Sequence, residues 1–289
     1  MEPHVPNTLP PGLTPERVEH LIADALAEDL GHGGDITSNS TIPEDLHFQG
    51  VLAARQDMVV AGLDLAWLVF ATVDDTIDWQ AKCKDGDVLK AGDVVAHVSG
   101  QARALLTAER TALNLLQHLS GIATLAKTYV DAVAGTDTTI LDTRKTLPGY
   151  RELAKYAARM GGATNHRMRL DDAVLIKDNH IAVAGSITAA ITGAKAAGHS
   201  PIEVECDTLD QVREALDVGV DAILLDNMSV EQLVEAVALI GDQARSEASG
   251  GVTLETVRAI AQTGVNSISI GRITQSAPAV DIGLDWQTN

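Results

Sequence analysis

The sequence has little cysteine, no long apolar run and no apolar signal core near its N-terminus. Its two cysteines, Cys83 and Cys206, lie far apart and have no paired metal-ligand spacing, which excludes a disulfide framework and favours a reducing compartment. No window approaches the roughly 18 uninterrupted apolar residues that a membrane span needs, and the N-terminus has no apolar signal core. We therefore expect a soluble, cytoplasmic protein with no membrane partner.

Low-complexity segments and fixed repeats are also lacking, which excludes fibrous and solenoid architectures. The chain has 289 residues, of which 45% are hydrophobic and 21% charged. This length and composition are sufficient to bury one large core or two modest ones.

Positive charge is scarce overall but concentrated in one segment. The 21 Lys and Arg residues against 40 Asp and Glu give a net charge of −19, which disfavours nucleic acid as a partner. Residues 144–180 nevertheless carry eight basic and four acidic residues. A cationic segment inside an anionic protein indicates a pocket for a small, highly charged anion, although charge counting alone supports a solvated basic helix face equally well.

Short runs rich in Ile, Val and Leu recur from about residue 138 and predict successive βα units. These runs are 138–142, 173–178, 202–206, 222–227, 244–249 and 267–271. Each run ends in a polar residue or glycine, which favours the catalytic face of a parallel barrel over a doubly wound sheet. Residues 207–219 and 229–241 begin with N-cap residues and stop at glycine, so we predict outer helices there.

The first part of the chain has a different pattern and predicts a separate α+β domain over residues 1–112. Its expected elements are a helix at 15–30, a turn at 33–38, strands at 48–55 and 77–84, and a turn-rich scaffold segment at 84–100. A long helical pattern from Thr107 to Val133, interrupted at Gly121, leads into a barrel domain at 113–275. The tail, residues 276–289, is a candidate for returning to the first domain.

The strongest cluster of candidate functional residues lies at strand and loop ends. Arg144 and Lys145 follow the first predicted strand, His166 and Arg167 follow a Gly-Gly loop, and Lys177 closes the second strand. Arginine offers a rigid fork that matches carboxylates and phosphates, and lysine supplies a compact point charge. The mixture predicts a polycarboxylate or polyphosphate ligand, whereas any one of these residues alone would be interpreted as a surface cation.

Several long ungapped segments carry a resemblance to a known family. They are GDITS (34–38), LLTAERTALNLLQHLSGIAT (105–124), LDTRKTLPG (141–149), GGATNHRMRLDDAVLIKDNH (161–180), IEVECD (202–207), ILLDN (223–227), EASGG (247–251) and IGRITQS (270–276). In these segments the sequence resembles quinolinate phosphoribosyltransferases. The resemblance implies an α/β fold with an N-terminal α+β sandwich domain followed by an incomplete, six- to seven-stranded TIM-like barrel.

The resemblance also implies an activity: phosphoribosyl pyrophosphate and quinolinate give nicotinate mononucleotide, pyrophosphate and carbon dioxide, with Mg²⁺, in NAD biosynthesis. It implies that the two quinolinate carboxylates are bound by Arg144, His166, Arg167 and Lys177, with Arg110 contributed by the neighbouring subunit of a homodimer. Assembly beyond the dimer is left open. From spacing alone, Arg110 would instead be an i, i+4 partner of a carboxylate on its own helix.

For the second substrate, the resemblance implies that Glu205 and Asp226 lie near the ribose and the Mg²⁺ ion, with Lys145 at the pyrophosphate. Taken alone, each acid would be a cap for the following helix. The implied phosphate-binding residues are Ser249, Gly250, Gly251 and Gly271, because free backbone N–H groups at a helix N-terminus bind phosphate. Lys145, Lys177, Glu205 and Asp226 are the expected catalytic residues. We expect Glu203 to face the other side of its strand from Glu205.

One position departs from the family pattern, because Gln275 stands where the family commonly has a histidine. Three alternatives remain open. The first is a related phosphoribosyltransferase that acts on another pyridine or azole carboxylate without decarboxylation. The second is an aldolase that forms a Schiff base on Lys177, and the third is a non-catalytic anion sensor on the same fold. Cys206 is interpreted as a buried side chain without a role.

Overall fold

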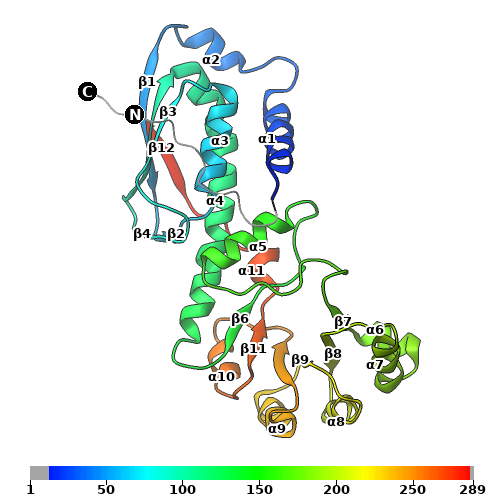
Figure 1. Cartoon of the computed structure of the whole chain (residues 1–289). Coiled ribbons are helices and arrows are strands. Elements are labelled where there is room, and N and C mark those ends of the chain that lie inside the picture. The colour runs from blue at the N-terminus through cyan, green and yellow to red at the C-terminus, as the bar shows by residue number, and fades with distance from the viewer. Residues whose placement is uncertain (1–12, 287–289) are drawn as a thin grey trace. The chain divides into compact units, whose positions relative to one another are not determined.

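The computed structural model describes residues 13–286 and divides them into two compact units (Figure 1). The first unit comprises residues 13–125, 152–162 and 276–286, and the second comprises residues 126–151 and 163–275. The ends of the chain that belong to the predicted N-terminal domain and tail, residues 1–12 and 287–289, lie outside the described residues.

The first unit contains an antiparallel sheet with helices on one face (Figure 1). Its elements are α1 (Pro15–Leu30), α2 (Ile36–Thr41), β1 (His47–Ala54), β2 (Met58–Val59), α3 (Leu63–Val73), β3 (Asp78–Ala81), β4 (Val88–Leu89), β5 (Val94–Gln101), most of α4 (Ala102–Ala132), nearly all of α5 (Arg151–Met160) and β12 (Ile282–Trp286). The sheet has the order β12-β1-β5-β3, and β2 pairs separately with β4. The rings of Phe70 and Trp79, 5.7 Å apart, join α3 to the sheet.

Local sequence signals explain the first two helices. Thr14 caps α1, Pro15 occupies its first turn, and Val18, Ile22 and Leu26 form its buried stripe at a spacing of four residues. The predicted turn at 33–38 is in part a helix start, because the Asp35 side chain accepts the Ser38 N–H at 2.9 Å and so caps α2.

The prediction that the long helix is interrupted at Gly121 is wrong. Helix α4 is continuous over 31 residues and begins at Ala102. A side chain at Gly121 would place its Cβ 2.1 Å from the Pro278 carbonyl oxygen, so the glycine permits a close backbone approach within an intact helix. The predicted domain boundary at residues 112 and 113 falls inside α4 and stays a prediction.

The second unit alternates strands and helices. Its elements are β6 (Thr139–Leu141), β7 (Val174–Ile176), α6 (Asp178–Ala184), α7 (Ile187–Ala196), β8 (Ile202–Cys206), α8 (Leu209–Val218), β9 (Ala222–Asp226), α9 (Val230–Ile240), β10 (Arg245–Ser249), α10 (Val257–Ala261), β11 (Ser267–Ser269) and α11 (Arg272–Gln275). All six predicted strands are therefore present, and α8 and α9 are the two predicted helices. Each of these two helices begins with a capping box and ends at glycine.

The six strands form one parallel sheet with the order β6-β11-β10-β9-β8-β7. From β7 to β11, strands that follow one another in the chain are neighbours in the sheet, and β6 lies beside β11. This is the order of a barrel left open between β6 and β7. The α/β fold class is thus confirmed. Side chains alternate along each strand: Val204, Cys206, Ile223 and Leu225 are fully buried, and the residues between them include Glu205 and Leu224, which line a cavity.

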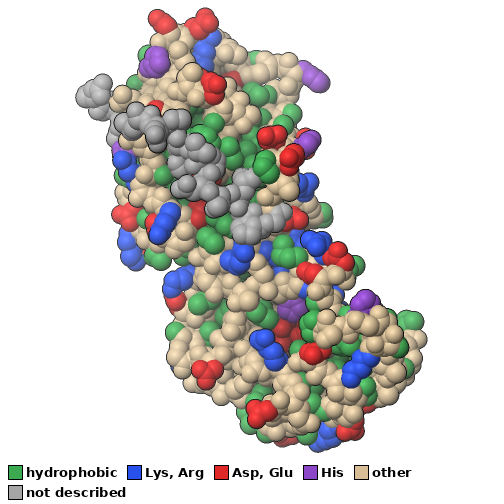
Figure 2. Space-filling model, viewed as in Figure 1, with side chains coloured by type: hydrophobic (Ala, Val, Ile, Leu, Met, Phe, Trp, Pro, Cys, Tyr) green, Lys and Arg blue, Asp and Glu red, His purple; other side chains and the backbone are tan. Residues whose placement is uncertain are grey.

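Charged side chains of both signs are spread over the visible surface, and acidic ones are prominent (Figure 2). Among residues 13–286, no helix is long and apolar enough to cross a membrane.

Candidate functional site

A cavity of about 650 Å³ opens at the carboxyl ends of the parallel strands, and every residue that lines it belongs to the second unit. Twelve residues singled out from the sequence line it: Arg144, Lys145, His166, Arg167, Lys177, Glu205, Asp226, Ser249, Gly250, Gly251, Gly271 and Gln275. Arg110 is exposed on the part of α4 that belongs to the first unit and does not line this cavity. Strand C-termini are where α/β barrels carry their ligand sites.

The predicted cationic segment is divided by the structure. Arg144, Lys145, Arg167 and Lys177 line the cavity, whereas Lys155 belongs to the stretch of α5 in the first unit. Burial lowers the pKa of Arg167, and the charge of Arg144 lowers it further. Two guanidinium groups that line one cavity indicate a place for an anion with more than one carboxylate or phosphate.

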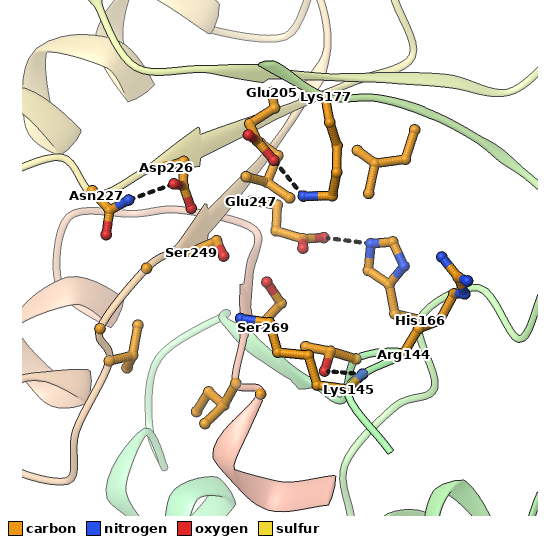
Figure 3. A pocket seen from close by; sticks show the side chains of 18 of the residues that line it. Arg144, Lys145, His166, Lys177, Glu205, Asp226, Asn227, Glu247, Ser249 and Ser269 are labelled. Atoms are coloured by element: carbon orange, nitrogen blue, oxygen red, sulfur yellow. Dashed lines mark hydrogen bonds and ion pairs between the residues drawn. The ribbon is translucent and has the colours of Figure 1, made fainter. Parts of the chain in front are cut away.

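Two acids line the cavity from β8 and β9. The carboxylate of Glu205, only 8% exposed, pairs with the Lys177 ammonium group (Figure 3). Asp226 ends β9, and burial raises the pKa of its carboxyl, followed by the charge of Glu205. Because two neighbouring carboxylates repel each other, a cation bound between them would be stabilised.

These two acids fit a divalent cation such as Mg²⁺, which prefers one or two carboxylates together with substrate oxygens. The observation that supports this fit is that both carboxylates line the same cavity from the adjacent, paired strands β8 and β9. Ser249 supports Asp226 by a side-chain hydrogen bond.

A tight turn after β10 holds Asn227, the residue that follows Asp226. Asn227 has a left-handed backbone, with φ of 54°, and its N–H donates to the Ser249 carbonyl at 2.9 Å. Its side-chain amide donates to the Asp226 carboxylate (Figure 3). Gly250, with φ of 93°, packs against this amide. The turn therefore orients Asp226 through Asn227.

Lys145 follows β6 and is held by residues that come directly after β11. Its backbone carbonyl accepts the Thr274 hydroxyl at 2.9 Å. Its side chain passes so close to Gly271 that a Cβ there would lie 2.9 Å from the Lys145 Cδ. Gly271 thus makes room for the lysine, which is a contact that sequence reasoning did not identify.

His166 lies among acids that sequence reasoning missed or misplaced. Its Nε2 atom is 3.2 Å from a Glu203 oxygen and 3.4 Å from a Glu247 oxygen. The expectation that Glu203 faces away from Glu205 is wrong, because residues two apart on a strand share a face. Glu247 lay within the quoted segment EASGG but was given no role; its position two residues before Ser249, on the same strand face, was the available signal.

Burial and neighbouring charges shift the pKa of His166 and of Glu203. Burial raises the pKa of Glu203. Burial lowers the pKa of His166, but the hydrogen bonds and charges of Glu203 and Glu247 raise it above its ordinary value. The backbone N–H of Arg167 donates to Nδ1 of His166 at 2.8 Å. Nδ1 therefore has no proton, and Nε2 carries one. The ring proton on Nε2 therefore faces the two glutamates.

Further polar side chains line the cavity or support its loops but were not predicted. Thr143, Asn227, Glu247, Ser269 and Arg272 line it, and Asp142 supports the loop that carries His166. Cys206 is fully buried, as predicted, and burial followed by the charge of Asp207 raises its thiol pKa to about 12.

The fold and the cavity together define an α/β protein whose parallel strands bring cationic side chains and a pair of acids to one cavity. Comparison with known families makes this class specific. The quinolinate phosphoribosyl transferase N-terminal domain matches residues 35–120, and the C-terminal domain of the same family matches residues 122–285. The chain belongs to the quinolinate phosphoribosyl transferase family, as its sequence motifs predicted.

Relatives match over most of their length. A nicotinate-nucleotide pyrophosphorylase [carboxylating] of Mycobacterium leprae is 45% identical over 270 residues, which cover 91% of this chain and 95% of the relative. The crystal structure of a nicotinate-nucleotide pyrophosphorylase from Ehrlichia chaffeensis is 42% identical, with a TM-score of 0.90 over 93% of this chain and 98% of that one. The corresponding structure from Francisella tularensis is 38% identical, with a TM-score of 0.91 over 97% of this chain and all of that one.

Proposed function

We propose that the protein transfers the phosphoribosyl group of phosphoribosyl pyrophosphate to quinolinate with decarboxylation, giving nicotinate mononucleotide, pyrophosphate and carbon dioxide in NAD biosynthesis. The observation that carries this proposal is the single cavity in which Arg144, Arg167 and the two lysines lie with the acids Glu205 and Asp226. A dicarboxylate and a phosphorylated sugar need these two kinds of group. The names of the relatives support the same reaction.

We assign the two carboxylates of quinolinate to Arg144, His166, Arg167 and Lys177. The guanidinium groups offer paired N–H donors that match a carboxylate, and Lys177 offers a point charge from the end of β7. Arg110 would complete the site from a second subunit, which makes a homodimer the proposed active form. Its exposure on α4 leaves its guanidinium accessible to a partner.

Phosphoribosyl pyrophosphate is assigned to the other side of the cavity. Ser249, Gly250 and Gly251 would hold the 5′-phosphate with backbone N–H groups, together with Gly271, and Lys145 would bind the pyrophosphate. Glu205 and Asp226 would bind the ribose hydroxyls and Mg²⁺. When bound, Mg²⁺ would supply positive charge that stabilises the departing pyrophosphate.

The first chemical step needs no general base from the protein. The pyridine nitrogen attacks C1 of the ribose as the bond from C1 to pyrophosphate breaks, through an oxocarbenium-like transition state. Glu205 and Asp226 stabilise the positive charge at the ribose, and Lys145 and Lys177 neutralise the negative charge that develops on the leaving group. The cavity thus supplies position and electrostatics.

The second step removes the carboxylate next to the ring nitrogen. Ribosylation makes this nitrogen cationic, so the ring accepts the electron pair that is released when carbon dioxide leaves. The ring carbon then takes a proton from solvent water in place of the lost carboxylate. Arg144, Arg167 and His166 need only hold the remaining carboxylate and the ring.

The test is to mix the purified protein with quinolinate, phosphoribosyl pyrophosphate and Mg²⁺ and to follow nicotinate mononucleotide and carbon dioxide, with nicotinate as a parallel substrate. We expect product from quinolinate only. Lys145→Ala and Arg110→Ala should keep the fold, measured by circular dichroism, and lose turnover by orders of magnitude. Product from nicotinate instead would refute the two-carboxylate assignment, and rates like those of the wild type in both variants would refute the site. The predicted cytoplasmic location stays a prediction.

A further inference from the structure

Three buried carboxylates converge on the loop that carries His166, and substrate binding does not account for them. Asp142 is fully buried at the end of β6, Glu247 on β10 is 5% exposed, and Glu203 lies on β8 with its side chain 13% exposed. These strands alternate with β11 and β9 in the sheet. Alternate strands normally fill a barrel interior with bulky apolar side chains, so acids there need a structural or functional reason.

The three acids hold His166 by both its backbone and its ring. Asp142 accepts the His166 N–H at 2.9 Å with one oxygen and the Asn165 side-chain amide with the other. Glu203 and Glu247 flank Nε2 at 3.2 and 3.4 Å, while the Arg167 N–H occupies Nδ1. Both ring nitrogens therefore have partners within the protein, and the ring has one orientation and one tautomer.

His166, Glu203 and Glu247 lie close enough to hold a metal ion, since their ligand atoms are all within 4.8 Å of one another. The hydrogen bond at Nδ1 argues against a metal. A metal would need the Nε2 lone pair, which would move the ring proton to Nδ1, where the Arg167 N–H already points. The cluster is built around an N–H donor.

The cluster adjoins the cavity. His166 and Glu247 both line it, and Arg167, the next residue, does so as well. One oxygen of Glu247 is buried without a hydrogen-bond partner. Burying it costs free energy that an apolar side chain at this position would not cost. The pair of glutamates is thus placed to fix what faces the substrate rather than to stabilise the barrel.

We propose that Glu203 and Glu247 are positioning residues for the pyridine dicarboxylate: they fix the imidazole of His166, and through it the backbone at Arg167, at the cavity wall. Neither glutamate touches the substrate. This inference rests on the proposed function, and it adds two residues that set affinity for the dicarboxylate and not for phosphoribosyl pyrophosphate.

The test compares Glu247→Leu with Glu247→Gln, because leucine removes the acceptor and glutamine keeps one. We expect Glu247→Leu to raise KM for quinolinate about tenfold to a hundredfold, with KM for phosphoribosyl pyrophosphate changed less than about twofold. Glu247→Gln should recover most of the loss. Glu235→Leu on the exposed face of α9 is the matched control for adding leucine. If Glu247→Leu does not fold, Glu203→Leu and Glu203→Gln form the same pair.

A second readout does not depend on turnover. Nitrogen-15 NMR of the histidine rings, with His166 assigned by His166→Asn, should show a protonated Nε2 and an unprotonated Nδ1 in the wild type and a changed pattern in Glu247→Leu. An unchanged pattern, or equal increases in both KM values, would overturn the proposal. Wild-type protein that does not convert quinolinate would refute the proposed function, while the NMR pattern would still decide whether the glutamates hold the ring.

Discussion

The turn after β10 allows a prediction in which two adjacent glycines serve as test and control. Gly250 and Gly251 both have positive φ, 93° and 58°. A Cβ at Gly250 would lie 2.2 Å from the Asn227 side-chain oxygen and 2.7 Å from its backbone nitrogen, whereas a Cβ at Gly251 would meet nothing within 4 Å. Gly250→Ala therefore adds a steric clash to the backbone strain, and Gly251→Ala adds the strain alone.

The expected magnitudes differ accordingly. An alanine in the left-handed region costs about 1–2 kcal/mol, which applies to both variants. Displacing the Asn227 amide and backbone adds about 1–3 kcal/mol in Gly250→Ala. Since about 1 kcal/mol shifts the unfolding temperature of a chain of this size by roughly 2–4 °C, Gly250→Ala should melt at least about 2 °C below Gly251→Ala.

Differential scanning calorimetry of both variants at one protein concentration measures this difference. Because Asn227 donates to the Asp226 carboxylate, Gly250→Ala should also weaken Mg²⁺ binding measured by titration calorimetry. Equal melting temperatures for the two variants would show that Asn227 is not packed against Gly250 and would refute the argument that the turn orients Asp226.

Three further predictions concern other parts of the chain. Gly121→Ala should lower the melting temperature by several degrees in the same calorimetric scan, because its Cβ would lie 2.1 Å from the Pro278 carbonyl oxygen; an unchanged value would contradict this approach. Asp85→Asn should cost about 1.5–3 kcal/mol in urea unfolding, since the carboxylate accepts two N–H groups at the start of α3 and a tyrosine hydroxyl. The pKa of both thiols, Cys83 and Cys206, is raised from 9.0 to about 12, so at pH 8 the thiolate fraction falls about a thousandfold. The rate of alkylation, measured by mass spectrometry, should therefore rise with pH and on unfolding. Rapid alkylation of the folded protein would contradict the burial of the thiols.

Strands β8 and β9 were predictable because each is a short, largely apolar run next to α8 or α9, which have clear caps and terminal glycines. Cys206 and Val204 illustrate why: one face of each strand packs under helices and must be apolar. The cationic residues were predictable in the same way, since a charge directly after such a run lies at the cavity end of the sheet.

What the sequence did not reveal depends on contacts between distant residues. Gly121 looks like a helix break until Pro278 is placed against it. Glu247 is the single acid in a strand that also contains an arginine, two serines and an alanine, and only its proximity to His166 gives it a role. The error at Glu203 was of a different kind, because the two-residue period of a strand already places it with Glu205.

The pairing of β12 with β1 has a consequence for biosynthesis. β1 is an inner strand of its sheet only when β12 lies beside it, and about 230 residues separate the two in the chain. At a synthesis rate of about 5–20 residues per second, a ribosome needs roughly 10–50 s to cover that distance. During this interval the nascent chain exposes an unpaired strand edge of the kind that aggregates or recruits chaperones. The first part of the protein to be made is therefore among the last to be completed.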